Sequence, residues 1–312
     1  MLSRLLIRNF AYASMLMTMI SCASADGFST KVASLKDKMT AAGEKTESKV
    51  NQKTDSIRAA GSSFSKAFED IPPEDEYYIG RSVAATILAN YKTYENEKLQ
   101  VYLNNICQAL VINSDVPEIF NGYHVKVLDS TEINAFATSG GHVFITKGLI
   151  GCTSNEDSLA AVIAHEIGHI QLKHGLKAIK NDRFMSATKQ TVKAVTQSPE
   201  KNQAEEMDGM VNDVMSQMVN NGYSQKQEFE ADAFAVKLLE DSGYAPSEMV
   251  TMLELIEKNQ KNSKAGLYKT HPTPKSRITN VKANMGKKAS AIKVDESRTR
   301  RYNEVMSAYA GK

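Results

Sequence analysis

The sequence predicts an α+β fold that is mostly helical and carries one small β-sheet. Three observations lead to this class. Apolar residues recur at helical spacing through most of the chain after residue 74. Runs with strand character are confined to residues 125–146, and helix-capping patterns open two of the later segments. The 312 residues are enough for one large domain with its own core.

Charge and cysteine content exclude some classes of function. The chain has 38 Lys+Arg and 36 Asp+Glu, and Arg4 and Arg8 supply the excess, so its body is neutral. A neutral body argues against nucleic acid as the main partner, because phosphate binding needs a basic surface. Three cysteines do not make a disulfide framework. Cys107 and Cys152 are expected either to pair in an oxidising compartment or to remain buried thiols.

Residues 1–25 have the pattern of a secretory signal peptide. Two arginines precede an apolar stretch from Phe10 to Ile20, which is shorter than the roughly 20 residues that span a bilayer. Met19–Cys22 resembles a lipobox that would place a lipid on Cys22, whereas Ala23–Ala25 is an A-x-A site that would release a free protein. A mitochondrial presequence is the third alternative. The first two readings place the protein in the periplasm, either free or anchored to the outer membrane.

The rest of the chain divides into three parts. Residues 26–71 are rich in Ala, Ser, Lys and Thr, which predicts a polar tether. Pro72 and Pro73 mark the start of a folded domain over residues 72–280. Residues 281–312 are basic and are expected to form a solvated C-terminal helix or tail.

Within the domain, periodicity and turn residues predict the individual elements. We expect two helices over 74–112, a strand at Val125–Leu128, and a hairpin of Ile133–Thr138 with His142–Thr146 through two glycines. A capping box of Thr153 and Glu156 predicts a helix that Gly175 ends, and one of Ser224 and Gln227 predicts a helix that Gly243 closes. Further helices are expected within 176–222, within 246–262 and after a loop that begins at Thr270.

The segment His165–His169 (HEIGH) carries the strongest chemical signal. With six histidines in the chain, this HExxH pattern is expected by chance only about 0.008 times. Two histidines four residues apart lie on one face of a helix, so both imidazoles can hold one metal ion. Glu166 is rotated off that axis and can reach a water on the metal. Zn²⁺ lowers the pKa of such a water to about 7, and a nearby carboxylate can then accept its proton.

A catalytic zinc takes a third protein ligand and keeps one position open. The segment 228–232 (EFEAD) offers this ligand, and Glu228 shares a helix face with Ala231 and other apolar residues, whereas Glu230 lies on the charged face. The sequence therefore predicts His165, His169 and Glu228 as ligands of one Zn²⁺ per chain. Asp232, one turn beyond Glu228, is expected to accept the second ring N–H of a ligand histidine.

These motifs together resemble the HtpX/Oma-type gluzincin metallopeptidases, the family that also includes the CAAX prenyl endopeptidases. The matching pieces run in the family's order over roughly residues 74–280: Asn134–Ala137 with Gly140–Gly141, the HExxH helix, Glu228 with Ala231 and Asp232, and His271–Pro272 followed by Arg277. The resemblance implies a thermolysin-like zincin core with an edge strand beside the active-site helix. The chain lacks the membrane helices of HtpX and of the prenyl endopeptidases, so the resemblance is closest to soluble periplasmic members.

The remaining candidates concern substrate binding and transition-state stabilisation. In the family the strand after Gly141 lines the cleft, so His142–Thr146 is expected as an edge strand that pairs with an extended substrate. His271 is expected to stabilise the oxyanion, or alternatively to coordinate zinc in a resting form. Arg277 is a second donor or a structural ion pair, and Asn134 is a candidate for bonding substrate backbone. Three other histidines, His124, His142 and His174, are read as structural or exposed, and His174 lies about 140° round the helix from His169.

Two functions of different classes fit these predictions. The first is a zinc endopeptidase that hydrolyses exposed or misfolded polypeptides in the bacterial cell envelope. The second is a zinc-containing, chaperone-like factor that assists envelope protein assembly with little proteolysis, using the Met-bearing helix at 204–220 as an apolar contact. A purely structural metal site is less consistent with a glutamate beside the first histidine and only three protein ligands.

Overall fold

The computed structural model describes residues 71–179, 201–260, 270–271, 274–286, 289 and 291–310. All of them belong to the unit Ala67–Lys312. The predicted signal peptide and nearly all of the predicted tether, residues 1–70, lie outside the described residues. Among the described residues, none of the helices combines the length and the apolar character needed to cross a membrane.

The sheet has three strands in the order β1-β3-β2: β1 (His124–Leu128), β2 (Ala135–Thr138) and β3 (His142–Thr146). The predicted hairpin is confirmed, because β2 and β3 pair antiparallel across Gly140 and Gly141, both of which have positive φ. β1 pairs parallel with the other side of β3. The expectation that His142–Thr146 is an edge strand is therefore wrong. Within the described part of the chain, β2 is the edge strand that contacts the central helix α6.

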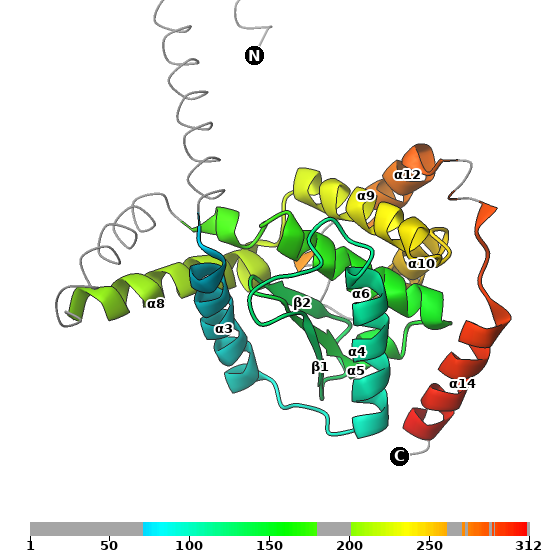
Figure 1. Ribbon diagram of the computed structural model, residues 1–312, viewed down its shortest axis with the longest axis horizontal. Coiled ribbons are helices and arrows are strands. Elements are labelled where there is room, and N and C mark those ends of the chain that lie inside the picture. Colours follow the sequence, from blue (N-terminus) through cyan, green and yellow to red (C-terminus); the bar gives the residue numbers. More distant parts are fainter. Residues whose placement is uncertain are drawn as a thin grey trace, which may run out of the picture. The chain divides into compact units, whose positions relative to one another are not determined.

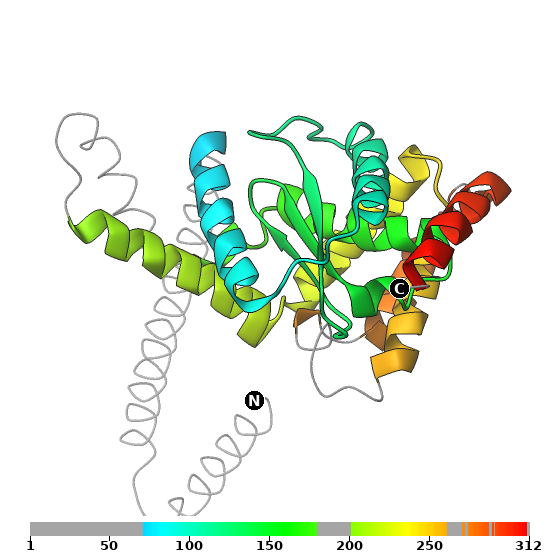
Figure 2. The same ribbon diagram turned by 90° about the horizontal axis from the view of Figure 1, so that it is seen from below.

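Two helices precede the sheet, as the apolar stripes predict. They are α3 (Pro73–Asn90) and α4 (Glu97–Val111). The buried stripe of α4 includes Leu99, Leu103, Ile106 and Leu110, and it packs against β1 and α6. Figures 1 and 2 both show α3 beside α8 at one end of the described fold, with α14 at the other.

Helix α6 (Glu156–Gln171) is the centre of the fold, and every residue from Glu156 to Ile170 is buried. It contacts β2 and β3 as well as α9 (Gln225–Asp241) and α10 (Glu248–Gln260) (Figure 1). Its N-cap is Asn155, which forms a reciprocal capping box with Ser158. The prediction of a box between Thr153 and Glu156 is wrong, because the Glu156 carboxylate is turned inward to protein partners instead.

The remaining elements complete the helical layer. They are α5 (Lys147–Ile150), η1 (Leu176–Ala178), α8 (Lys201–Met215), the π-helical turn η2 (Ser216–Asn221), α12 (Pro274–Asn284) and α14 (Glu296–Ala310). The capping box of Ser224 and Gln227 is confirmed at the start of α9. Gly243, at φ +75°, follows its end, as predicted.

Helix α14 is attached to the start of α6 rather than solvated as expected. Arg298 donates two hydrogen bonds to Asp157, both at 2.9 Å, and Arg301 pairs with Glu156. Both carboxylates are buried, and Tyr302 of α14 is buried as well. The basic residues of this segment therefore include two partners for acids at the N-terminus of α6.

Cys107 is a free thiol, so a disulfide between Cys107 and Cys152 does not describe this structure. Cys107 is fully buried, and burial raises the pKa of its thiol to about 12. The other prediction, two buried thiols, therefore holds for Cys107 but not for Cys152, which is only partly buried.

Candidate metal centre

The close approach of α6 and α9 creates the candidate site. A Cβ atom on Gly168 would lie 3.2 Å from the carbonyl oxygen of Ala231 and 3.3 Å from its Cα, which is tighter than ordinary van der Waals contact, so glycine favours the close approach of α9. Ala231 and Ala235, which face α6, are small and fully buried. Gly168 precedes the second histidine of the motif, so the two helices meet where the predicted ligands project.

The structure brings four donor side chains together at this crossing. One ligand atom each from His165, His169, Glu228 and His271 lies within 4.8 Å of the others. The Nε2 atoms of His165 and His169 are 3.0 Å apart, and Nδ1 of His271 lies 3.3 Å from Nε2 of His165. Glu228 Oε1 lies 2.9 Å from Nδ1 of His271 and 3.5 Å from Nε2 of His169. The distant Glu228 therefore reaches the two histidines of α6, as predicted.

These distances fit a zinc ion. Four ligand atoms at about 2.0–2.1 Å from a common centre would be about 3.3 Å apart in a tetrahedron, and the observed separations scatter around that value. Three imidazole nitrogens and one carboxylate oxygen are also a donor set that zinc accepts. All four side chains are buried, with residue exposures of 4% or less.

Glu166 lies beside the donor group rather than in it. Its Oε1 is 3.8 Å from Nε2 of His271, and its buried Oε2 has no hydrogen-bond partner among the described residues. Burial raises the pKa of this carboxyl group, although the nearby histidines oppose the shift. An unpaired carboxylate oxygen with raised basicity suits a group that accepts a proton from water.

Asp232 and Arg277 lie behind the first ligand. Asp232 Oδ1 is 3.0 Å from Nδ1 of His165, the position predicted for it. Arg277 donates to Asp232 and also pairs with Glu228, with Nη1 2.7 Å from Oε2. Of the two predictions for Arg277, its contacts match the structural ion pair. Burial alone would raise the pKa of Glu228, but Arg277 and His271 hold it well below its usual range.

His271 faces both the ligands and Glu166. Burial alone would lower the pKa of His271, but the Glu228 carboxylate raises it. By contrast, burial lowers the pKa of His169 well below its ordinary value. The two predictions for His271 both find support in its position, because Nδ1 joins the donor group while Nε2 points toward Glu166.

Asn134 is not part of the donor group, but it binds Thr270, the residue before His271. Its Oδ1 accepts a hydrogen bond from the Thr270 hydroxyl at 3.1 Å, and the backbone N–H of Tyr223 donates to the Thr270 carbonyl at 3.0 Å. The Tyr223 ring stacks on His169 with centroids 4.0 Å apart. Tyr223 was not among the site residues predicted from the sequence. Its position directly before the cap of α9 was the only signal for it.

His174 is also closer to the site than the sequence predicted. The chain leaves the helix after Gln171, and Lys173 adopts a left-handed φ of +55°. His174 N–H then donates to the His169 carbonyl at 3.0 Å, which is the Schellman pattern of a helix end. The predicted rotation of about 140° between His169 and His174 holds only for a helix that continues past Gln171. Instead, the fully buried ring of His174 lies against His169, with the two Nδ1 atoms 3.0 Å apart.

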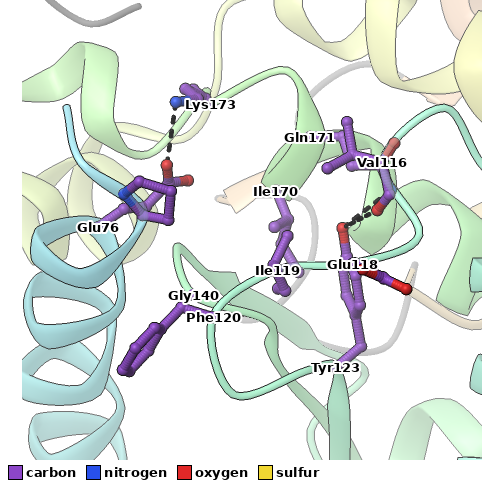
Figure 3. A pocket seen from close by; sticks show the side chains of 11 residues that line it. Glu76, Val116, Glu118, Ile119, Phe120, Tyr123, Gly140, Ile170, Gln171 and Lys173 are labelled. Atoms are coloured by element: carbon purple, nitrogen blue, oxygen red, sulfur yellow. Dashed lines mark hydrogen bonds and ion pairs between the residues drawn. The ribbon is translucent and has the colours of Figure 1, made fainter. Parts of the chain in front are cut away.

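Two cavities adjoin α6. The one at the donor group is lined by His165, Glu166, His271 and Arg277 with neighbouring apolar residues, and its volume of about 10 Å³ holds roughly one water. A larger cavity of about 160 Å³ lies past the end of α6, between α3 and the loop before β1. Figure 3 shows Ile119 and Ile170 in this cavity, with the Lys173–Glu76 ion pair to one side. None of its lining residues belongs to the donor group.

A buried set of four donor side chains with a carboxylate beside it that can accept a proton is the arrangement expected of a metallohydrolase. Comparison with known proteins narrows this class. The model for peptidase family M48 matches residues 97–285, which is more than half of the chain. The chain belongs to peptidase family M48, and its buried donor group fits the Zn²⁺ cofactor of the zinc metallopeptidases in this family.

Curated relatives agree with the family. The beta-barrel assembly-enhancing protease of Escherichia coli K12 is 29% identical over 215 residues, which cover 66% of this chain and 42% of that protein. Metalloprotease LoiP of the same organism is 26% identical over 160 residues, 51% of this chain and 62% of LoiP. The mitochondrial metalloendopeptidase OMA1 of Schizosaccharomyces pombe is 24% identical over 227 residues, 69% of this chain and 63% of OMA1. The chain thus spans less than two thirds of each of these relatives.

Proposed function

We propose that this protein is an endopeptidase that hydrolyses exposed or misfolded polypeptides in the bacterial cell envelope, with His165, His169 and Glu228 as its zinc ligands. The observation that carries the proposal is the buried donor group with the unpaired oxygen of Glu166 beside it. Polypeptide substrates follow from the peptidase family. The envelope location rests on the predicted signal peptide and on the similarity to the beta-barrel assembly-enhancing protease. Lipidation at Cys22 and a tether over 26–71 remain part of this proposal.

Each residue near the donor group has a distinct part in the proposed reaction. Zinc, when bound, polarises the scissile carbonyl and makes a water more acidic. The Glu166 carboxylate accepts a proton from the attacking water and passes it to the leaving amine. The N–H of His271 stabilises the negative charge that develops on the carbonyl oxygen. Asp232 accepts the second N–H of His165 and so keeps Nε2 of that ring available as a ligand.

An extended substrate would pair with β2 rather than with β3. β2 has one side unpaired among the described strands and contacts α6, whereas β3 is paired on both sides. Main-chain pairing tolerates many side chains, which suits unfolded substrates. The small cavity at the site has room for water only. Substrate entry therefore requires the surrounding elements to move apart.

The test is Glu166→Gln in the purified protein. The variant should retain one Zn²⁺ per chain and lose casein hydrolysis by at least about 100-fold, because the amide no longer accepts a proton. Metal content and cleavage should be measured side by side with wild type. Unchanged hydrolysis by the variant would remove Glu166 from the mechanism, and a wild-type protein that binds no zinc would remove the metal site.

The chaperone-like alternative finds less support. It assigned an apolar contact to the Met-bearing segment 204–220, but Met210 and Met218 are buried in the body of the protein. The similarity to a beta-barrel assembly-enhancing protease is the observation that supports this second function. Suppression of aggregation of a test envelope protein by Glu166→Gln, equal to that by wild type, would favour it.

A further inference from the structure

The ring of His169 makes a chain of polar contacts on the side away from the donor group. His174 Nδ1 lies 3.0 Å from Nδ1 of His169, and His174 Nε2 lies 3.3 Å from Oε2 of Glu230. A carboxylate oxygen only accepts, so Nε2 of His174 carries the proton and Nδ1 of the neutral ring is an acceptor. Nδ1 of His169 must then be the donor. The lone pair of His169 is consequently left on Nε2, the atom that faces the other ligands.

We propose that His174 and Glu230 form a positioning relay for the metal ligand His169. The relay fixes the tautomer and the ring orientation of His169, as Asp232 does for His165. This inference rests on the proposed metal site. It gives positioning roles to His174, which the sequence predicted to be structural or exposed, and to Glu230, which it predicted to be a surface acid. Buried partners of this kind raise the basicity of a ligand imidazole and hold it in the geometry that the metal requires.

The backbone places His174 with little freedom. Lys173 N–H donates to Ile170 O at 2.9 Å and His174 N–H donates to His169 O at 3.0 Å, which together close the end of α6. In this motif the residue after the left-handed position packs on the helix residue five positions earlier, which here is His169 itself. Lys173 is in turn held by an ion pair from Nζ to Glu76 Oε2 at 3.0 Å, visible in Figure 3. The turn is thus anchored to α3.

Burial makes these contacts consequential. His174 is fully buried, so water does not replace a missing partner on either ring nitrogen. Tyr223 stacks on the ring of His169, and its hydroxyl has no hydrogen-bond partner among the described residues. Glu230 is partly exposed and also lies 3.6 Å from Lys226. The relay therefore ends at an acid that is in contact with solvent and a lysine, and not at an unpaired buried acid.

The main test is zinc affinity by chelator competition, with the absorption spectrum of the Co²⁺-substituted protein as a second readout. His174→Phe keeps a ring of similar size but removes the acceptor, and it should weaken zinc binding by about 10–100-fold and alter the Co²⁺ spectrum. His174→Asn offers an oxygen near the position of Nδ1 and should recover most of the affinity. If His174 were only structural, its substitution would change the unfolding midpoint of the metal-free protein, but zinc affinity would not fall in His174→Phe and recover in His174→Asn.

Glu230→Leu tests the relay without altering the buried ring. It should weaken zinc binding in the same direction, by up to about tenfold, whereas Glu254→Leu, which removes an exposed acid paired with Lys282, should not. If His174→Phe does not fold, Glu230→Leu and His174→Asn decide the question. Wild-type affinity and an unchanged Co²⁺ spectrum in Glu230→Leu and in folded His174→Phe would overturn the relay while leaving the metal site intact. Absence of zinc binding in wild type would instead overturn the proposed function.

Discussion

Asp232 accepts a bidentate pair of hydrogen bonds from Arg277, with Nε to Oδ2 at 2.9 Å and Nη2 to Oδ1 at 2.6 Å. Both residues are buried. The guanidinium balances the carboxylate charge, and Oδ1 still lies 3.0 Å from His165. Although burial alone would raise the pKa of Asp232, Arg277 and His165 lower it below its ordinary value of 3.8.

This pKa shift predicts how stability depends on pH. A carboxyl group with a lowered pKa in the folded state contributes stability that is present above its unfolded pKa and is lost as pH falls through the folded pKa. We expect Asp232→Asn to destabilise the zinc-free protein at pH 6. The difference from wild type should shrink as pH drops below 3.8. Urea unfolding midpoints between pH 3 and pH 6 measure this, and a difference that stays constant over the range would contradict it.

The attachment of α14 to α6 predicts a stability effect far from the metal centre. Arg298→Met leaves Asp157 buried without its cation and should cost about 3 kcal/mol of unfolding free energy. Arg300→Met, on the exposed side of the same helix, is the matched control and should be nearly neutral. Equal urea midpoints for the two variants would mean that the Arg298–Asp157 ion pair contributes nothing to the free energy of unfolding.

The close approach at Gly168 predicts that an added methyl group is harmful. Gly168→Ala would place Cβ 3.1 Å from Phe234 and 3.2 Å from the Ala231 carbonyl, so the Phe234 ring and α9 must give way by a few tenths of an ångström, one turn from Glu228. The expected cost is about 1–3 kcal/mol, together with weaker zinc binding. Gly151→Ala serves as the control, because its Cβ would meet nothing closer than 3.4 Å. Zinc titration of both variants checks the prediction, which fails if Gly168→Ala binds like Gly151→Ala.

His271 offers a test of its two proposed roles. His271→Ala should keep zinc, because His165, His169 and Glu228 remain, and it should lower kcat for casein by about 100-fold through loss of the oxyanion donor. Zinc content and initial rates should be recorded on the same preparation. Faster hydrolysis than wild type would show instead that His271 acts as a fourth ligand that blocks the site.

Local sequence patterns were enough to predict much of this protein. The period of apolar residues predicted α3 and α4, and the paired glycines predicted the β2–β3 hairpin. The four-residue spacing of His165 and His169 placed both rings on one face of α6. These predictions succeeded because each depends on the backbone geometry of a few neighbouring residues. Helix periodicity also predicted correctly that Glu228 lies on the buried face of α9 and Glu230 on the more exposed face.

Only the tertiary structure decided which strand lies at the edge, which partner each buried charge takes, and where α6 ends. Strand order depends on the pairing of β1 with β3, which no local pattern encodes. For Arg277 the contacts match the structural ion pair rather than the oxyanion donor, because α12 packs against α9 and brings Arg277 to two buried acids. His174 contacts His169, contrary to the prediction, because the left-handed residue Lys173 ends the helix before it. Contacts between residues distant in sequence depend on how whole elements pack, and periodicity within one element carries no information about that packing.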